Sequence, residues 1–87
     1  MGLTKEEIQN IVKRYGLHEK DVGSPEVQIA ILSEEIKRLT EHLKRNKKDH
    51  NSKRGLILKI AQRRKLLKYL ERKSIERYQK IVKELKL

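Results

Sequence analysis

Two apolar seams constrain the fold of this chain more than any other feature of its sequence. The first lies in a predicted helix at about residues 24–45 and consists of Ile29, Leu32, Ile36, Leu39 and Leu43, spaced alternately by three and four residues. The second follows a turn without apolar residues at 46–51 and consists of Leu56, Ile60, Leu67 and Leu70. Such spacing places the apolar side chains on one narrow side of a helix, which suits packing against an antiparallel partner. The two seams therefore predict a long helical hairpin.

Two shorter helices are expected on either side of this hairpin. Thr4 followed by Glu7 is a capping box, and the first helix should run to Tyr15, before Gly16. Ser74 should cap a last helix whose apolar positions are Ile75, Tyr78, Ile81, Val82 and Leu85. The chain of 87 residues shows no strand alternation and no internal repeat. We therefore expect one all-α domain over residues 1–87, with the second and third helices forming a long antiparallel hairpin, the fourth packed on it, and a short, mobile first helix.

Positive charge is concentrated in one part of the chain. The net charge is +11, and residues 44–73 hold 13 Lys or Arg but two acids, whereas residues 1–43 hold six basic and eight acidic residues. At ~100° per residue, a stripe of cations should project away from the second seam. Its members are Arg54, Lys65, Lys68 and Arg72, with Arg64 beside them and Tyr69 at the border. An ordinary solvated surface would interleave acids, and here only Glu71 does so, which favours contact with a phosphate backbone.

Arg63 is the exception, because it falls on the apolar side of the same helix. Its stem should lie along the seam with its head in water.

Several classes of function are disfavoured. The chain has no cysteine, so disulfides and thiolate metal sites are excluded and a reducing compartment, the cytoplasm, is the default. No apolar run approaches the ~18 residues of a membrane span, so no membrane association is expected. The three histidines form no i,i+4 pair, and no carboxylate recurs at ligand spacing, so neither a metal nor a cofactor is expected. A ribonuclease using His42 or His50 as a base lacks a concave site, so the chain is not expected to be an enzyme.

The turn between the hairpin helices carries a small polar cluster. In an antiparallel hairpin His42 should lie near Asp49 and Ser52. A carboxylate among so many cations should repel phosphate, so Asp49 requires a reason. Either it caps the third helix, or it accepts a hydrogen bond from a base amino group with Ser52 and His42 beside it. The second alternative would favour RNA, whose shallow minor groove displays guanine amino groups and 2′-hydroxyls.

The start of the second helix is a further candidate contact. Ser24 and Pro25 mark it, with Gly23 before it and Gln28 in its first turn. Gly23 and Gln28 could reflect only turn geometry and a surface amide, but a helix start also presents backbone N–H groups to a phosphate. Tyr69 is equally open, because it could cover the hairpin, stack on an unpaired base or bond a phosphate.

Four blocks of the sequence closely resemble the bacterial family of small-subunit ribosomal protein number fifteen. They are residues 21–28 (DVGSPEVQ), 39–44 (LTEHLK), 47–56 (KKDHNSKRGL) and 63–70 (RRKLLKYL), and the likeness covers essentially the whole chain. The resemblance implies a four-helix structural protein that binds 16S ribosomal RNA early in assembly of the small subunit, at a three-way junction and a nearby duplex. It also implies help in bridging to the large subunit.

The resemblance assigns roles by position. It implies that His42, Asp49 and Ser52 read a guanine-containing minor groove. It also implies that the junction is held by Gly23, Gln28, Arg64, Lys65, Tyr69 and Arg72. Val22 stands where the family usually has threonine, which puts that junction contact in doubt, while Asn51 and Lys53 replace a frequent histidine and arginine.

The implied partners are 16S ribosomal RNA, other small-subunit proteins through the assembled RNA, and large-subunit RNA at a bridge. The chain is expected to be cytoplasmic, bound to the ribosome, and monomeric when free. A non-specific DNA-binding, nucleoid-type helical protein is the alternative, since it needs the same cations but neither the Asp49 cluster nor Gly23 and Gln28. A self-associating coiled coil is a second rival.

Overall fold

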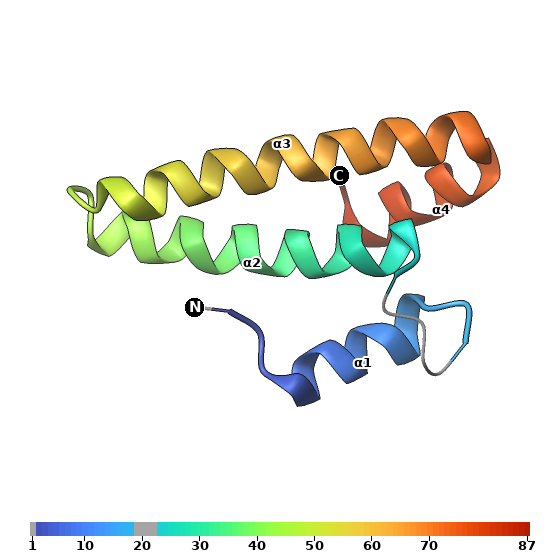
Figure 1. The fold of residues 1–87 in the computed structure, drawn as a ribbon, viewed down its shortest axis with the longest axis horizontal. Coiled ribbons are helices and arrows are strands. Elements are labelled where there is room, and N and C mark those ends of the chain that lie inside the picture. The colour runs from blue at the N-terminus through green and yellow to red at the C-terminus, as the bar shows by residue number, and fades with distance from the viewer. Residues whose placement is uncertain (1, 19–22) are drawn as a thin grey trace.

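The computed structural model describes residues 2–18 and 23–87 and contains four helices in that part of the chain. They are α1 (Lys5–Tyr15), α2 (Pro25–Arg45), α3 (His50–Lys73) and α4 (Ile75–Leu85) (Figure 1). The prediction of an all-α fold with a long central hairpin is confirmed. In the described residues, no helix is both long enough and apolar enough to cross a membrane.

Side-chain caps set where each helix begins. The Thr4 and Glu7 capping box is formed, and Ser24 and Ser74 cap α2 and α4, as predicted. Asp49 caps α3, so that helix begins at His50, inside the stretch 46–51 that the sequence predicted as turn. The carboxylate accepts the Ser52 backbone N–H, which allows the last residues of this turn to be helical.

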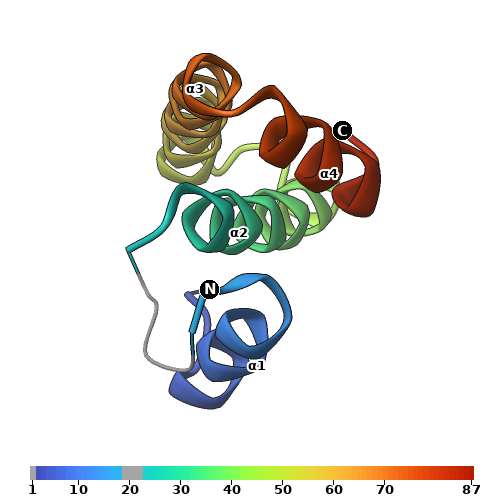
Figure 2. The same cartoon turned by 90° about the vertical axis from the view of Figure 1, so that its right-hand side faces the viewer.

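Helix α2 is the centre of the molecule. Figure 1 shows α3 running antiparallel along α2, and α4 folding back beside both, so that the predicted packing of the fourth helix is confirmed. The end-on view in Figure 2 shows α1 on the side of α2 that faces away from α3. Helix α2 therefore packs against three other helices.

The core follows from this central position. Ile29 of α2, Leu70 of α3 and Ile81 of α4 form its buried cluster, and full burial of such a side chain contributes ~1.5–3 kcal/mol. Val27 and Ala30 are also buried, although neither belongs to the predicted seam. The seam accounts for contact with one antiparallel partner, whereas α2 has neighbours on three sides.

One expectation about an apolar side chain is corrected, and one basic side chain has a further partner. Ile75 was assigned to the packed side of the last helix but is 50% exposed, because it lies at the corner directly after the Ser74 cap. Arg63 lies at the hairpin seam, and its partly buried head donates from Nη1 to the Ser33 Oγ of α2 at 3.2 Å. Partial burial of the guanidinium lowers the pKa of Arg63.

Two ion pairs attach the shorter helices to α2. Arg38 of α2 pairs with Glu7 of α1, which gives the short first helix a polar anchor; its mobility remains a prediction. Arg77 of α4 donates to both carboxylate oxygens of Glu26 at 2.6 Å each, in a bidentate arrangement. Because the Glu26 residue is buried, this pair fixes α4 against the start of α2.

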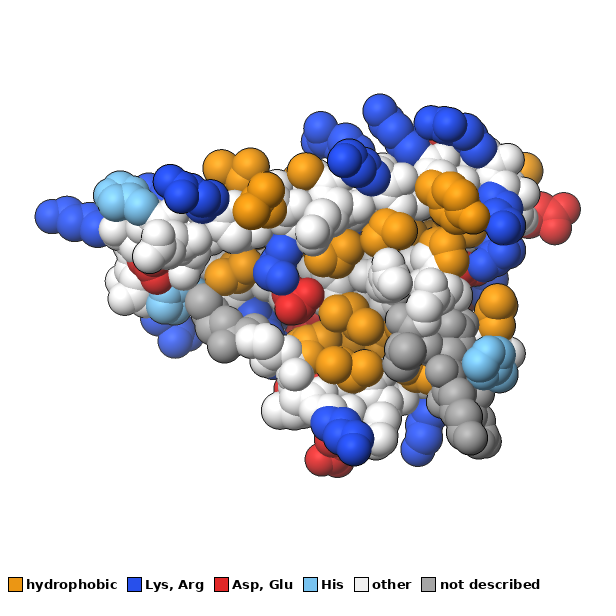
Figure 3. All heavy atoms as spheres, in the orientation of Figure 1, with side chains coloured by type: hydrophobic (Ala, Val, Ile, Leu, Met, Phe, Trp, Pro, Cys, Tyr) orange, Lys and Arg blue, Asp and Glu red, His pale blue; other side chains and the backbone are white. Residues whose placement is uncertain are grey.

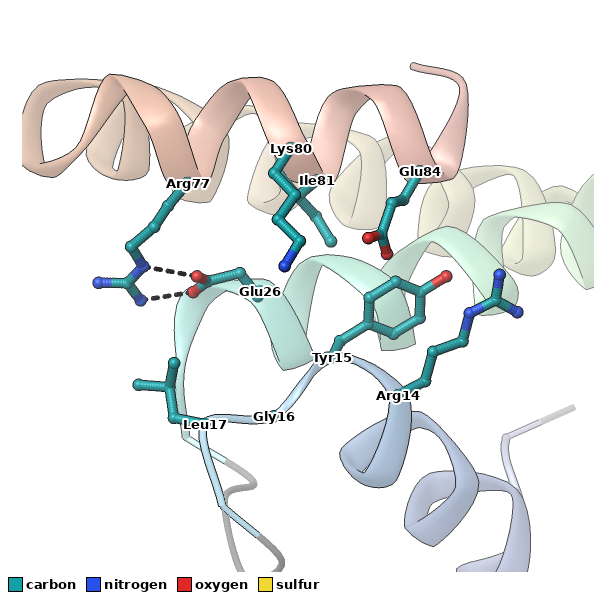
Figure 4. Close-up of a pocket in the computed structure, with 9 residues that line it drawn as sticks. All are labelled: Arg14, Tyr15, Gly16, Leu17, Glu26, Arg77, Lys80, Ile81 and Glu84. Atoms are coloured by element: carbon teal, nitrogen blue, oxygen red, sulfur yellow. Dashed lines mark hydrogen bonds and ion pairs between the residues drawn. The ribbon is translucent and has the colours of Figure 1, made fainter.

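A small hollow of about 210 Å³ lies beside this second pair, between the end of α1, the start of α2 and α4 (Figure 4). Tyr15 and Ile81 form apolar parts of its wall, and Lys80 extends into it. The bidentate contact of Arg77 with Glu26 occupies the polar side of the hollow and joins α4 to α2.

Candidate nucleic-acid interface

The predicted polar cluster forms at the turn between α2 and α3. Asp49 is its centre: its Oδ2 lies 2.8 Å from the Nε2 of His42 and accepts the Ser52 hydroxyl at 2.7 Å. Its Oδ1 accepts the Ser52 backbone N–H at 3.1 Å. The three side chains therefore meet at the end of the hairpin that Figure 1 shows on the left, as the antiparallel arrangement predicted.

The structure shows directly that Asp49 caps α3. It also bears on the alternative that Asp49 accepts a hydrogen bond from a base amino group. A carboxylate offers about four acceptor positions, and three interactions within the cluster already engage this one. Since the Ser52 hydroxyl donates its proton to Asp49, the remaining lone pairs of its oxygen can only accept. Asp49 thus orients Ser52 as a hydrogen-bond acceptor at the surface of the turn.

Asn46 belongs to the same cluster, and the sequence reasoning missed it. Its side-chain nitrogen lies 3.4 Å from the Nδ1 of His42 and donates to the His42 carbonyl at 3.1 Å. A carboxylate accepts, so the Nε2 of His42 carries a proton, and Nδ1 can then accept from Asn46. The i,i+4 spacing of His42 and Asn46 at a helix end was the available signal.

Hydrogen bonding lowers the pKa of Asp49 from 3.8 to about 2. The hydroxyl of Ser52 is the largest cause, followed by the side chain of His42 and the backbone N–H of Ser52. All three favour the charged carboxylate, so the cluster keeps one negative charge within the most basic part of the chain.

This lowered pKa predicts how the stability of the fold depends on pH. A carboxyl whose folded pKa lies below its unfolded value stabilises the fold above the unfolded pKa, and that stabilisation is lost as pH falls through the folded pKa. We expect the melting-temperature difference between the wild type and Asp49→Asn to be constant above about pH 5 and to shrink from about pH 4 to pH 2. Thermal unfolding followed by circular dichroism at pH 2–7 measures it. Parallel curves for the two proteins would contradict the lowered pKa.

The cations of the predicted stripe lie at the surface of α3. Arg54, Arg64, Lys65, Lys68 and Arg72 are all exposed. Figure 3 shows Lys and Arg side chains gathered along the outer edge of the C-terminal half of α3, with apolar side chains interrupting this edge nearer the turn.

Exposed apolar side chains interrupt the basic stripe. Ile57 and Leu58 lie between Arg54 and Lys65 in the sequence and are 67% and 58% exposed. Neither belongs to the α3 seam, and the described parts of α1 and α4 do not cover them. The concentrated charge begins at Arg64 and continues to the end of α3.

Gln28 and Lys65 come together across the hairpin. Both line an open groove of about 470 Å³ between α2 and α3, whose floor includes Leu32 and Leu66. Gln28 and Lys65 lie far apart in the sequence, and the antiparallel packing makes them neighbours. The groove thus joins one residue from the start of α2 to the basic stripe.

The start of α2 offers less to a phosphate than expected. Pro25 has no N–H, and the N–H of Val27 is accepted by the Ser24 hydroxyl at 3.4 Å. Gly23 and the side chain of Gln28 are exposed, so the amide of Gln28 is a polar group that this end presents. The substitution of valine for threonine at position 22 lies outside the described residues.

Tyr69 is available at the surface of α3. It is 50% exposed, which disagrees with a role in covering the hairpin. Lys73 donates to its hydroxyl at 3.2 Å and lies 5.6 Å from the ring centroid. A cation therefore lies beside the hydroxyl and over the ring, and the exposed remainder of the ring could stack on a base.

The candidate residues fall into two sets on one hairpin. The turn cluster of His42, Asp49 and Ser52 lies at one end, and the set around Gln28 and Lys65 lies towards the other. Fourteen residues separate His42 from Gln28 along α2, which corresponds to ~20 Å at 1.5 Å per residue. Within residues 2–18 and 23–87, no group of three or more His, Asp or Glu side chains could hold a metal ion.

Together, the fold and these two sets define a small, basic, all-α protein built on a helical hairpin, with an exposed cationic face and a polar cluster at its turn.

Comparison with known proteins identifies the family that this chain resembles. The family model described as ribosomal protein S15 matches residues 8–87. A protein of Dictyoglomus thermophilum and one of Carboxydothermus hydrogenoformans are each 60% identical over 87 residues, which is 100% of this chain and 98% of each relative. A protein of Rhodococcus jostii is 52% identical with the same coverage. All three are called small ribosomal subunit protein uS15.

The chain belongs to the ribosomal protein S15 family. Members of this family are structural constituents of the ribosome and are not enzymes. The sequence predicted a structural ribosomal protein without enzymatic activity, and family membership agrees with this.

Proposed function

We propose that this chain binds 16S ribosomal RNA directly as a structural protein of the small subunit, at a three-way junction and an adjacent duplex. One observation carries the proposal: a single helical hairpin holds a polar cluster and a basic set ~20 Å apart. Family membership supports the choice of ribosomal RNA over other polyanions.

The turn cluster would recognise the minor groove of the duplex. The Ser52 hydroxyl oxygen, held as an acceptor by Asp49, suits the amino group of a guanine or a ribose 2′-hydroxyl. Because the Ser52 hydroxyl already donates its proton to Asp49, it cannot rotate to act as a donor to the RNA. It therefore distinguishes RNA donors from RNA acceptors better than a free hydroxyl would.

The second set would hold the junction through phosphate contacts. Arg64, Lys65, Lys68 and Arg72 would neutralise phosphates, while Gln28 and Tyr69 supply hydrogen bonding and stacking. Because both sets lie on one hairpin, binding both fixes the duplex relative to the junction. RNA that already has this arrangement binds more tightly, so the protein would shift the population towards it and promote assembly of the small-subunit platform.

The same proposal sets the partners and location of the chain. It would be monomeric when free, bound to ribosomes in the cytoplasm, and would meet other small-subunit proteins through the assembled RNA. The face of the hairpin that does not contact 16S RNA could help bridge to large-subunit RNA.

The dependence of affinity on salt tests this proposal. With ~6–8 phosphate contacts, the logarithm of the association constant should fall against the logarithm of salt concentration with a slope of about −4 to −7. Filter binding to 16S RNA from 0.05 to 0.5 M KCl measures this slope. A slope near zero would contradict phosphate binding.

Competition with random-sequence duplex DNA is the control for specificity. The proposal predicts that this DNA displaces the 16S RNA poorly. Equal competition would favour the non-specific, nucleoid-type alternative.

A further inference from the structure

Gly55 lies inside α3, where glycine is among the least favourable residues. It is the sixth residue of this 24-residue helix, so it neither begins nor ends it. Among the described helices, α3 alone contains a glycine. A residue that weakens the longest helix of the molecule calls for a physical reason.

Nothing within the described protein supplies this reason. No described glycine has a positive backbone φ, so Gly55 is not needed for a left-handed conformation. A Cβ atom added at Gly55 would meet no atom within 4 Å, so no neighbouring helix requires the missing side chain. Alanine would fit here and would favour the helix.

The surroundings of Gly55 indicate what could require bare backbone. Ser52 lies one turn before it on the same side of α3, with its hydroxyl oxygen held as an acceptor by Asp49. Arg54 precedes Gly55 and is exposed, whereas Lys59, one turn later, pairs with Glu35 of α2 at 3.3 Å. A polar acceptor followed by an exposed cation matches a sugar–phosphate strand better than an apolar protein surface.

We propose that Gly55 is a close-approach point for one strand of the RNA duplex whose minor groove meets the turn cluster. Without a side chain, the helix backbone lets the ribose and phosphate of that strand come close enough for the bases to reach Ser52. A Cβ atom would push the strand outward and lengthen the hydrogen bonds made by the cluster. The inference rests on the proposed binding of 16S RNA and adds a residue that sets its geometry.

Two substitutions test this inference by separating folding from binding. Gly55→Ala should raise the melting temperature by ~3–6 °C, because alanine favours the helix. The same change should weaken binding to purified 16S RNA ~10-fold or more. Gly55→Leu should weaken it further, and binding to a random-sequence RNA duplex should change little for either variant.

Asn10→Ala in α1 is the matched control, because it also improves helix propensity at an exposed position but lies on another helix. It should raise the melting temperature without changing RNA affinity. A hydroxyl-radical footprint of Gly55→Ala should lose protection on the duplex strand while protection at the junction remains.

Wild-type affinity for 16S RNA in both Gly55 variants would overturn the inference and leave the proposed function intact. A wild-type chain that does not prefer 16S RNA over the random duplex would overturn the proposed function, and this inference with it.

Discussion

Replacing Arg64, Lys65, Lys68 and Arg72 together with glutamine is expected to lower the affinity for 16S RNA ~10³-fold at about 0.1 M salt. Each neutralised phosphate contributes ~0.7–0.9 to the slope of log affinity against log salt, so four lost contacts cost roughly three decades at this concentration. The slope itself should become shallower by about 3–4. Filter binding across a salt series measures both quantities.

The control for this variant removes four exposed cations elsewhere. Glutamine at Lys5, Lys13, Lys83 and Lys86 lowers the net charge from +11 to +7, as the stripe variant does, but leaves the outer surface of α3 unchanged. If affinity depends on the placement of charge, the control should bind far more tightly than the stripe variant. Equal losses in the two proteins would mean that net charge alone attracts the RNA.

Asp49→Asn is expected to weaken specific binding to 16S RNA by ~1–3 kcal/mol, that is, ~5- to 150-fold. Asparagine caps a helix about as well as aspartate, so α3 should keep its start and most of its stability. The asparagine amide has one oxygen and one NH2 group, and the NH2 group donates. If the oxygen keeps the cap by accepting the Ser52 N–H, the NH2 group faces the Ser52 hydroxyl and His42 and cannot accept from them as Oδ2 does. Isothermal calorimetry with 16S RNA, beside thermal unfolding, separates the two effects.

Asp49→Ala and Ser52→Ala complete this comparison. Loss of the cap in Asp49→Ala should cost ~1 kcal/mol of stability in addition to specificity, whereas Ser52→Ala removes the proposed acceptor. Binding to a random duplex should hold or rise slightly in the Asp49 variants, because a negative charge near phosphate is gone. Unchanged specificity in Asp49→Asn and Ser52→Ala would leave Asp49 with its capping role alone.

The helices could be predicted from the sequence because local signals agreed with long-range packing. Ser24, Ser74 and the Thr4 capping box mark helix starts through bonds to residues three positions away, and the seams repeat every three or four residues. Such signals lie within a few residues and need no knowledge of the fold.

Burial that depends on several neighbours was not predictable in this way. Val27 and Ala30 are buried because α1, α3 and α4 all pack around α2, and the periodicity of one helix does not say how many partners it has. For the same reason Ile75, Ile57 and Leu58 could not be placed, since apolar residues at a helix corner or on an uncovered side look like core residues in the sequence.

The residues of the candidate site could be predicted from the sequence, but the hydrogen bonds among them could not. The hairpin topology brings His42 to Asp49 and Gln28 to the groove that Lys65 lines. The hydrogen bonds that turn Ser52 into an acceptor, and the participation of Asn46, depend on side-chain geometry within a few ångströms. The sequence contains these residues but does not specify which proton each one donates.

Directed hydroxyl-radical probing shows whether one hairpin binds two separate RNA elements. The chain has no cysteine, so an iron chelate can be attached to a single cysteine introduced as Lys47→Cys at the turn, or as Glu71→Cys near the end of α3. We expect the two probes to cleave two distinct segments of 16S RNA, one in a duplex and one at a junction. Cleavage of the same nucleotides by both probes, or scattered cleavage by either, would contradict it.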